Sequence, residues 1–313
     1  MPFPPATAYP IPFANKFPAV ELFFAISGFV ICLISVKPNF RPLQFLARRA
    51  FRLYPLWILT SLIFWRLAVV ALGLPEHHTP SFFGYSLTLL PTDGYPFYDI
   101  GWSLQHEIAF YILAALLVPR FGLLGLSAFL CAGIAIDHVF ALPWYLHQYA
   151  GFYPHFLAGI AAFAAGRHLK AFGFWLPTAI GAGLLVLFAL TIGDAAYPIA
   201  LFFLLAGLVN IQFNKTSTVG KIGVLLGDAS YSIYLIHPLV FYYVYAKLQP
   251  PLPPIWSQEF FRFGSIAVVC LLAIASWKLF ESPIIRLGNR LTNRTRTSVT
   301  GVQDAEAGPV ALR

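Results

Sequence analysis

Long apolar stretches, separated by short basic segments, run through almost the whole of this 313-residue chain. Hydrophobic residues make up 59% of it and charged residues only 10%, whereas soluble domains carry roughly a quarter charged residues. The 31 Phe, 15 Tyr and 7 Trp are too many ordering side chains for a chain that stays solvated. The sequence therefore excludes an ordinary water-soluble domain and a disordered chain, and it predicts an all-α, polytopic bundle of transmembrane helices.

The apolar stretches set the expected number of spans. A spanning helix needs about 20 mostly apolar residues, with roughly 17 to 25 tolerated. The segment 81–90 is shorter, rises only about 15 Å as a helix, and is interpreted as re-entrant or interfacial. About nine spans are predicted, some of them short, near residues 19–36, 55–74, 102–119, 122–137, 152–166, 174–192, 195–211, 230–247 and 260–280.

The basic residues predict the orientation, because Lys and Arg collect in the cytoplasmic loops of membrane proteins. If the first connection is placed inside, 15 of the 20 Lys and Arg residues fall on the cytoplasmic side. The predicted external loops 75–101, 138–151 and 249–259 then contain none. This arrangement puts the N-terminus outside and the C-terminus in the cytoplasm. It also explains the formal net charge of +8 by topology, so no nucleic-acid partner is expected.

Three regions follow from this pattern. Residues 1–18 form a Pro-rich N-terminal segment with no apolar core of signal-peptide length. Residues 19–285 form one membrane domain, and residues 286–313 form a polar, disordered cytoplasmic tail. The three cysteines lie in apolar runs and share no metal-ligand spacing, so no metal site is predicted.

Ionisable residues inside the spans are the functional candidates. Each costs at least a few kcal/mol in hydrocarbon, so it is retained where it faces a partner or a wet cavity. In the predicted orientation they form an outer level of Glu21, Arg66, His106, Glu107 and His155, and an inner level of Arg49, Arg52, His237 and Glu281.

Arg49 and Arg52 lie three residues apart, on one face of the helix that leads into the second span. Guanidinium groups hold phosphates through paired hydrogen bonds. The pair is therefore either a site for a phosphate-bearing ligand or a positive-inside anchor that touches lipid headgroups.

The stripe Ser103, Glu107 and Tyr111 recurs at intervals of four along the third span, with His106 beside it. An acidic, hydroxyl-bearing face of this kind suits contact with a sugar hydroxyl. The structural alternative is that Glu107 neutralises Arg66 inside the bundle.

His237 lies about 10 Å along its span by helical rise. It is either a proton-transfer group or a neutral imidazole that repairs the hydrogen bonding disturbed by Pro238. Glu281 and Pro283 are expected to end the last span, where the carboxylate can pair with the inner arginines. The Ser27-Gly28 pair is interpreted as a close helix-packing contact.

Five motifs together resemble the acyltransferase-3 family over about residues 15–285. Each motif alone is weak, but five of them in order are specific. They are the Val20-Glu21-Leu22-Phe23-Phe24-Ala25-Ile26-Ser27-Gly28-Phe29-Val30 run, Arg49-x-x-Arg52-Leu53-x-Pro55, Trp102-Ser103-Leu104-x-x-Glu107 ending in Phe110-Tyr111, Tyr231-Ser232-x-Tyr234-Leu235-x-His237-Pro238, and Glu281-x-Pro283.

The resemblance implies a multi-pass enzyme of the bacterial cytoplasmic membrane that moves an acyl group, commonly acetyl, to a hydroxyl of a surface or exported glycan. Acyl-CoA would be a co-substrate with no bound cofactor, and the partners would be membrane lipids and a glycan or lipid-linked saccharide. Arg49 and Arg52 would bind the donor. The resemblance and the polar groups together assign catalytic roles to Glu21, His106, Glu107 and His237, and substrate binding to Trp102, Ser103 and Tyr111.

One departure from the family pattern concerns the first helix. Members usually begin with a helix that carries a basic residue and a His regarded as the catalytic base, and this sequence has no such helix before Glu21. An added span would bring the total to ten and move the N-terminus inside. We therefore expect either a start site placed too far downstream or a truncated, nearly inactive member. Otherwise His106 or His237 would act as a substitute base.

Two other functions compete with this interpretation. A transporter or flippase for a lipid-linked saccharide also carries intramembrane charges and broken helices. A non-catalytic structural remnant would keep the same scaffold without the reaction.

Overall fold

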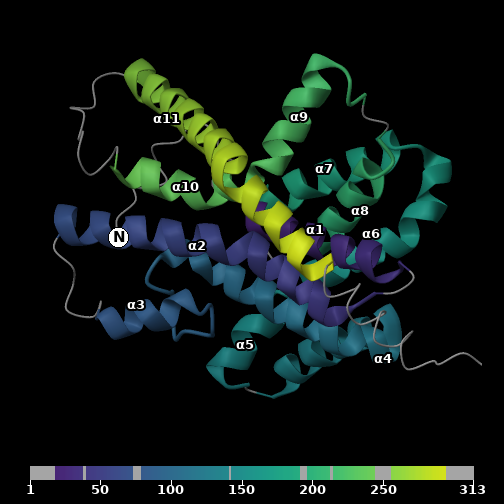
Figure 1. Cartoon of the computed structure of the whole chain (residues 1–313). Helices are drawn as coiled ribbons and strands as arrows, with labels where there is room; N and C mark the ends of the chain where they lie inside the picture. Colours follow the sequence, from purple (N-terminus) through teal and green to yellow (C-terminus); the bar gives the residue numbers. More distant parts are fainter. Residues whose placement is uncertain are drawn as a thin grey trace, which may run out of the picture. The chain divides into compact units, whose positions relative to one another are not determined.

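The structure is a computed structural model that describes residues 18–37, 40–72, 79–140, 142–190, 196–211, 214–243 and 255–293. In these ranges the chain forms helices and their connections, with no strand (Figure 1). The all-α prediction is confirmed. The Pro-rich segment, apart from Pro18, and residues 294–313 of the predicted tail lie outside the described residues. The chain divides into two compact units, residues 1–40 with 103–213 and residues 41–102 with 214–313.

The first unit is built on α1, α6, α7 and α8, which pack side by side in the order α1 on α6, α6 on α8 and α8 on α7. The long helix α4 contributes all of its residues except Trp102. The elements are α1 (Ala19–Ser35), α4 (Trp102–Val139), α5 (Trp144–Ala150), α6 (Tyr153–Leu169), the 3₁₀ turn η3 (Lys170–Phe172), α7 (Trp175–Leu190) and α8 (Tyr197–Leu208).

Two glycines allow α1 and α6 to approach closely. A Cβ added at Gly28 would lie 2.2 Å from the backbone oxygen of Phe156, and one added at Gly159 would lie 1.8 Å from the backbone oxygen of Ala25. Small residues at a helix interface permit this backbone contact in membrane bundles. The predicted packing role of the Ser27-Gly28 pair is confirmed for Gly28.

The second unit packs α10 against both α2 and α11. The hydroxyls of Tyr231 and Tyr234 donate to the backbone oxygens of Leu53 and Ile100, at 2.7 and 3.0 Å. These bonds join α10 to α2 and to the turn before α4. The elements are α2 (Pro42–Leu72), α3 (Pro80–Leu87), the 3₁₀ turn η2 (Asp99–Gly101), α9 (Thr218–Asp228), α10 (Ser230–Tyr243), α11 (Ile255–Ser276) and the π-turn η6 (Trp277–Glu281).

The last helix continues beyond the point where we expected it to end. The prediction that Glu281 and Pro283 terminate the span is wrong, because the helix runs on through 282–293. Pro283 has no N–H to donate, and the π-turn η6 immediately before it changes the local hydrogen-bond register, so the helix absorbs the proline. Residues 286–293, expected to begin a disordered tail, are therefore helical.

Two described helices are long and apolar enough to cross a membrane, Asp99–Val139 and Phe263–Asn293. A third is added if α9 and α10, bent by 68° at their junction, count as one span. Each predicted span overlaps a helix, and the two predicted at 102–119 and 122–137 join in α4 across a kink at Gly122 with φ 64°. Membrane-type helices are thus confirmed, while nine spans and their orientation remain predictions.

Two helical segments were not expected from the sequence, α5 and α9, which are too short or too polar to register as spans. The first half of α2 is the helix that we expected to lead into the second span. Helix α9 begins at Ser217, whose hydroxyl accepts from the Gly220 N–H at 3.0 Å. Ser217 is an ordinary N-cap residue. The sequence analysis looked for helices long enough to span a membrane, so it did not predict this short helix.

Candidate functional site

The Glu107 carboxylate is the centre of a buried polar cluster in the first unit. Its side chain is only 3% exposed, and its Oε1 accepts hydrogen bonds from the Tyr111 hydroxyl and, at 3.4 Å, from the Ser27 hydroxyl. Ser103 and Tyr111 are also buried, so the predicted stripe faces inward. Hydroxyl donors reduce the cost of keeping a carboxylate away from water.

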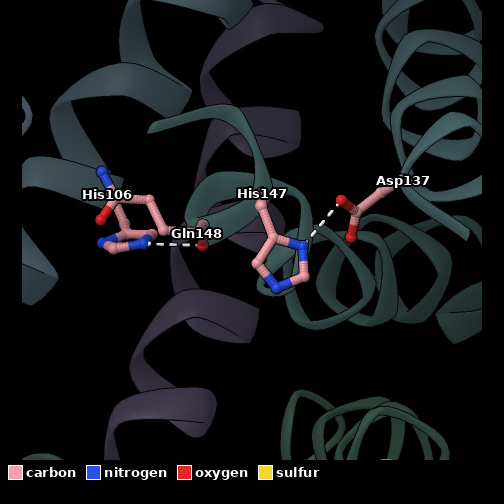
Figure 2. A network of polar contacts seen from close by, with 4 residues as sticks. All are labelled: His106, Asp137, His147 and Gln148. Carbon is pink, nitrogen blue, oxygen red and sulfur yellow. Dashed lines mark hydrogen bonds and ion pairs between the residues drawn. The ribbon is translucent and has the colours of Figure 1, made fainter. Parts of the chain in front are cut away.

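His106 is held by the short helix α5. Its Nε2 lies 3.0 Å from the backbone oxygen of Gln148 (Figure 2). A carbonyl oxygen only accepts, so Nε2 carries the hydrogen and Nδ1 is the basic nitrogen of the neutral ring. The ring centroids of Phe24, Tyr149 and Phe152 lie 5.9, 4.8 and 4.9 Å from that of His106. The imidazole is therefore fixed in one tautomer within an aromatic setting.

A second histidine contact in the same unit was not expected from the sequence. Nδ1 of His147, on α5, lies 2.8 Å from Oδ1 of Asp137 near the end of α4 (Figure 2). The side chain of His147 is 68% exposed and that of Asp137 only 10%. The carboxylate fixes the orientation of an imidazole that is open to its surroundings.

Glu21 lies in the first turn of α1 and is half-buried. It precedes Ser27 by six residues, which corresponds to about 9 Å of helical rise. The structure thus puts Glu21 on the same helix as one donor to Glu107, one to two turns away.

The predicted arginine pair lies on the first half of α2 in the second unit. Arg49 and Arg52 are both half-buried, and the guanidinium carbon of Arg49 lies 5.5 Å from the centre of the Phe45 ring. Arg48 is exposed and donates to Thr292 Oγ1 and Asn293 Oδ1, at 3.2 and 2.8 Å. Arg48 is therefore hydrogen-bonded to the end of the last helix, and donor binding by Arg49 and Arg52 stays a prediction.

Glu281 forms a second buried carboxylate cluster. It is 2% exposed, and its Oε1 accepts a hydrogen bond from the Ser232 hydroxyl. Ser232 Oγ also lies 3.0 Å from Ser276 Oγ. Arg52 is close enough for its positive charge to act on this carboxylate, but no ion pair joins these two described side chains, so the expected pairing of Glu281 with the inner arginines stays a prediction.

His237 makes its contact within its own helix. Its Nδ1 lies 3.3 Å from the Ile233 backbone oxygen, and the ring also interacts with the backbone of Tyr234. Pro238 leaves the Tyr234 carbonyl without its helical N–H donor. This geometry favours the helix-repair interpretation, with the imidazole bonded along α10.

Trp102 is half-buried and follows a tightly packed turn. A Cβ at Gly101 would lie 2.3 Å from the Trp57 ring, which itself lies parallel to the Tyr98 ring at 5.9 Å. The Tyr98 hydroxyl donates to the Leu235 backbone oxygen at 2.6 Å. Burial, followed by the neighbouring Asp99 carboxylate, raises the pKa of Tyr98, so the phenol stays protonated and donating.

The structure sorts the predicted site residues into two groups. Arg66 belongs to the second unit and is exposed, so its pairing with Glu107 of the first unit stays a prediction. The first unit holds Glu21, Ser103, His106, Glu107 and Tyr111, and the second holds Arg49, Arg52, Trp102 and His237.

Several polar partners were missed by the sequence analysis. Ser27 was interpreted only as a packing residue, yet its hydroxyl donates to Glu107. Ser232 was quoted only within a motif, although it donates to Glu281. Hydroxyl residues inside apolar runs were the available signal, but a carboxylate 49 or 80 residues away along the chain cannot be paired with them by spacing.

Apolar helices long enough to span, a basic helix and two buried carboxylates held by hydroxyls define a helical membrane protein with candidate catalytic groups in its interior. The sequence model of a protein family described as an acyltransferase domain matches residues 2–277. The chain belongs to this family, the acyltransferase-3 family, as the motifs indicated.

The exopolysaccharide production protein ExoZ of Rhizobium meliloti (strain 1021) is one relative. It is 29% identical over 300 residues, an alignment that covers 86% of this chain and 89% of ExoZ. No solved structure matches the chain. Sequence similarity therefore establishes the family, and the positions of this protein's side chains come from its own structure alone.

Proposed function

We propose that this protein transfers an acyl group, acetyl in the simplest case, from acyl-CoA to a hydroxyl of an exported polysaccharide at the bacterial cytoplasmic membrane. Membership of an acyltransferase family carries the reaction class. The name of the relative ExoZ, an exopolysaccharide production protein, supports a polysaccharide as the acceptor. A lipid-linked saccharide is the alternative form of the same acceptor.

The Glu107 cluster supplies the proton-handling part of this proposal. Acyl transfer requires removal of the proton from the attacking hydroxyl, a contribution of roughly 10² to 10⁴ in rate. Glu107 already accepts hydrogen bonds from the Tyr111 and Ser27 hydroxyls. A carboxylate buried among hydroxyls is suited to bind an acceptor alcohol and take its proton, with His106 beside it as the second candidate base.

The arginine pair supplies the donor part. Coenzyme A carries phosphate groups, and two guanidinium groups one helical turn apart suit phosphates. Arg49 and Arg52, both half-buried on α2, are the proposed donor-binding residues. Trp102, Ser103 and Tyr111 are the proposed acceptor-binding residues.

The test is acyl transfer by membranes that contain the protein expressed from its natural gene. Labelled acetyl-CoA and deacylated polysaccharide from the same organism are incubated with these membranes, and base-labile label in the polysaccharide is measured. Glu107→Gln keeps the acceptor for Tyr111 but loses the base, so transfer should fall by about 100-fold or more at unchanged protein abundance. Asp137→Asn is the matched control on the same helix and should retain transfer.

Two results would contradict the proposal. Wild-type membranes that form no product dependent on acetyl-CoA would remove the reaction and favour a transporter. A Glu107→Gln protein with full transfer would keep the reaction but move the base away from this cluster.

A further inference from the structure

Glu281 is a buried carboxylate that the proposed reaction does not use. It is 2% exposed. Ser232 donates to its Oε1, while its Oε2 has no hydrogen-bond partner among the residues that the structure describes. An isolated buried carboxylate is costly, and a nearby cation is the usual compensation.

The helices around Glu281 fix its place beside one short stretch of α2. Tyr231, the residue before Ser232, donates to the Leu53 backbone oxygen at 2.7 Å. Gly288, two turns beyond Glu281, lies against Phe51, since a Cβ there would be 2.5 Å from the Phe51 ring. The π-turn η6 also contacts α2 directly.

Arg52 lies between these two anchored residues. Phe51 and Leu53 are its neighbours in sequence, and both are held by the helices that carry Glu281 and Ser232. Arg52 is half-buried, unlike the exposed Arg48. Its positive charge acts on the Glu281 carboxylate across this packing contact, without a direct ion pair between the two described side chains.

We propose that Glu281 is a positioning residue for Arg52: the carboxylate, fixed by Ser232, attracts the guanidinium across the contact between η6 and α2, so that acyl-CoA phosphates meet a cation that is already oriented. This role rests on the proposed function and extends it to the last helix. Preorganisation of this kind lowers the cost of ordering a long side chain when ligand binds. Glu281 is the last residue of the π-turn η6, so this turn sets the direction in which the Glu281 side chain projects from the helix.

The proposal predicts an effect on donor affinity rather than on turnover. Glu281→Gln keeps the acceptor for Ser232 and removes the charge, so the KM for acetyl-CoA should rise about tenfold while kcat stays within about twofold. Arg48→Gln removes a charge from the same helix at a residue bonded elsewhere, and it should leave KM within about twofold. Steady-state acetyl transfer in membranes gives both constants.

A double-mutant cycle with Arg52→Gln separates positioning from a structural role. If Glu281 acts through Arg52, Glu281→Gln should not raise KM further once Arg52 is replaced. An equal rise in KM in both backgrounds, or a fall in kcat alone, would overturn the role. If Glu281→Gln does not accumulate, Ser232→Ala keeps every charge and should raise KM about threefold through the same carboxylate.

The outcomes also distinguish a failure of this positioning role from a failure of the proposed acyl-transfer function on which it rests. A wild-type protein without acetyl-CoA-dependent transfer defeats the proposed function, and the positioning role with it. A wild-type protein that transfers normally, with an unchanged KM in both Glu281→Gln and Ser232→Ala, defeats the positioning role alone.

Discussion

Among the residues that the structure describes, each unit holds one buried carboxylate, and the two are stabilised differently. Glu107 is 3% exposed and Glu281 is 2% exposed, and each accepts a hydrogen bond from a hydroxyl. Glu107 accepts from the Tyr111 hydroxyl, one turn along its own helix, and from the Ser27 hydroxyl of α1, whereas Glu281 accepts from the Ser232 hydroxyl of α10. Around Glu281, α2, α10 and the last helix converge, and the α2 residue Arg52 lies near the carboxylate.

This difference indicates two kinds of task. A carboxylate among hydroxyls can exchange a proton with another hydroxyl, which is what an acceptor alcohol provides. A carboxylate near a guanidinium restrains a cation, which is what a phosphate-bearing donor needs. The comparison therefore predicts that changes in the first unit lower kcat and that changes in the second raise KM for the donor.

The largest expected effect tests how rigidly the first unit holds Ser27 near Glu107. Gly159→Ala would put a Cβ 1.8 Å from the Ala25 backbone oxygen, and backbone cannot move aside as a side chain can. Overpacking of this type costs about 1–3 kcal/mol, so we expect reduced folded protein and reduced transfer. Thermal unfolding in detergent measures the loss of stability.

Two other glycines serve as controls for this change. Gly183→Ala, where nothing lies within 4 Å, should be neutral or gain about 0.5–1 kcal/mol. Gly288→Ala in the second unit would meet Cγ and Cβ of Phe51 at 2.5 and 2.7 Å, atoms near the backbone that move little, so it should also destabilise the protein but without touching the α1–α6 contact. Equal losses for Gly159→Ala and Gly183→Ala would show that the α1–α6 contact is not the limiting one.

The next largest effect compares one tyrosine from each unit. Tyr111→Phe removes a donor from the Glu107 carboxylate, a loss of about 1–3 kcal/mol for a bond to a charged group, and should lower kcat about tenfold or more. Tyr231→Phe removes a donor from the Leu53 backbone oxygen beside Arg52 and should mainly raise the KM for acetyl-CoA, by a few fold.

Kinetics of both variants, with Tyr85→Phe as a control at an exposed contact to Pro91, test the division of tasks. If Tyr231→Phe lowers kcat and Tyr111→Phe raises KM, the assignment of tasks to the two units is reversed.

The sequence predicted the helices and both carboxylates, because apolar stretches and rare ionisable residues are local signals. Periodicity also predicted that Ser103, Glu107 and Tyr111 share a face, and Glu107 does accept a bond from Tyr111. It could not predict that Ser27 and Ser232 serve Glu107 and Glu281, since those contacts depend on how helices far apart in sequence pack. The end of the last helix was misplaced because proline was weighed without the π-turn that accommodates it.

The smallest expected effect concerns the His147–Asp137 pair. With His147 68% exposed, its ion pair is worth about 0.2–1 kcal/mol by comparison with other surface pairs. His147→Asn should therefore leave kcat within about twofold and change thermal unfolding little. The geometry nevertheless gives this pair the form of an imidazole oriented by a carboxylate, which is how many general bases are arranged. A loss of transfer near 100-fold in His147→Asn, at normal abundance, would move the base from the buried Glu107 to this exposed pair and so break the contrast between the two carboxylates.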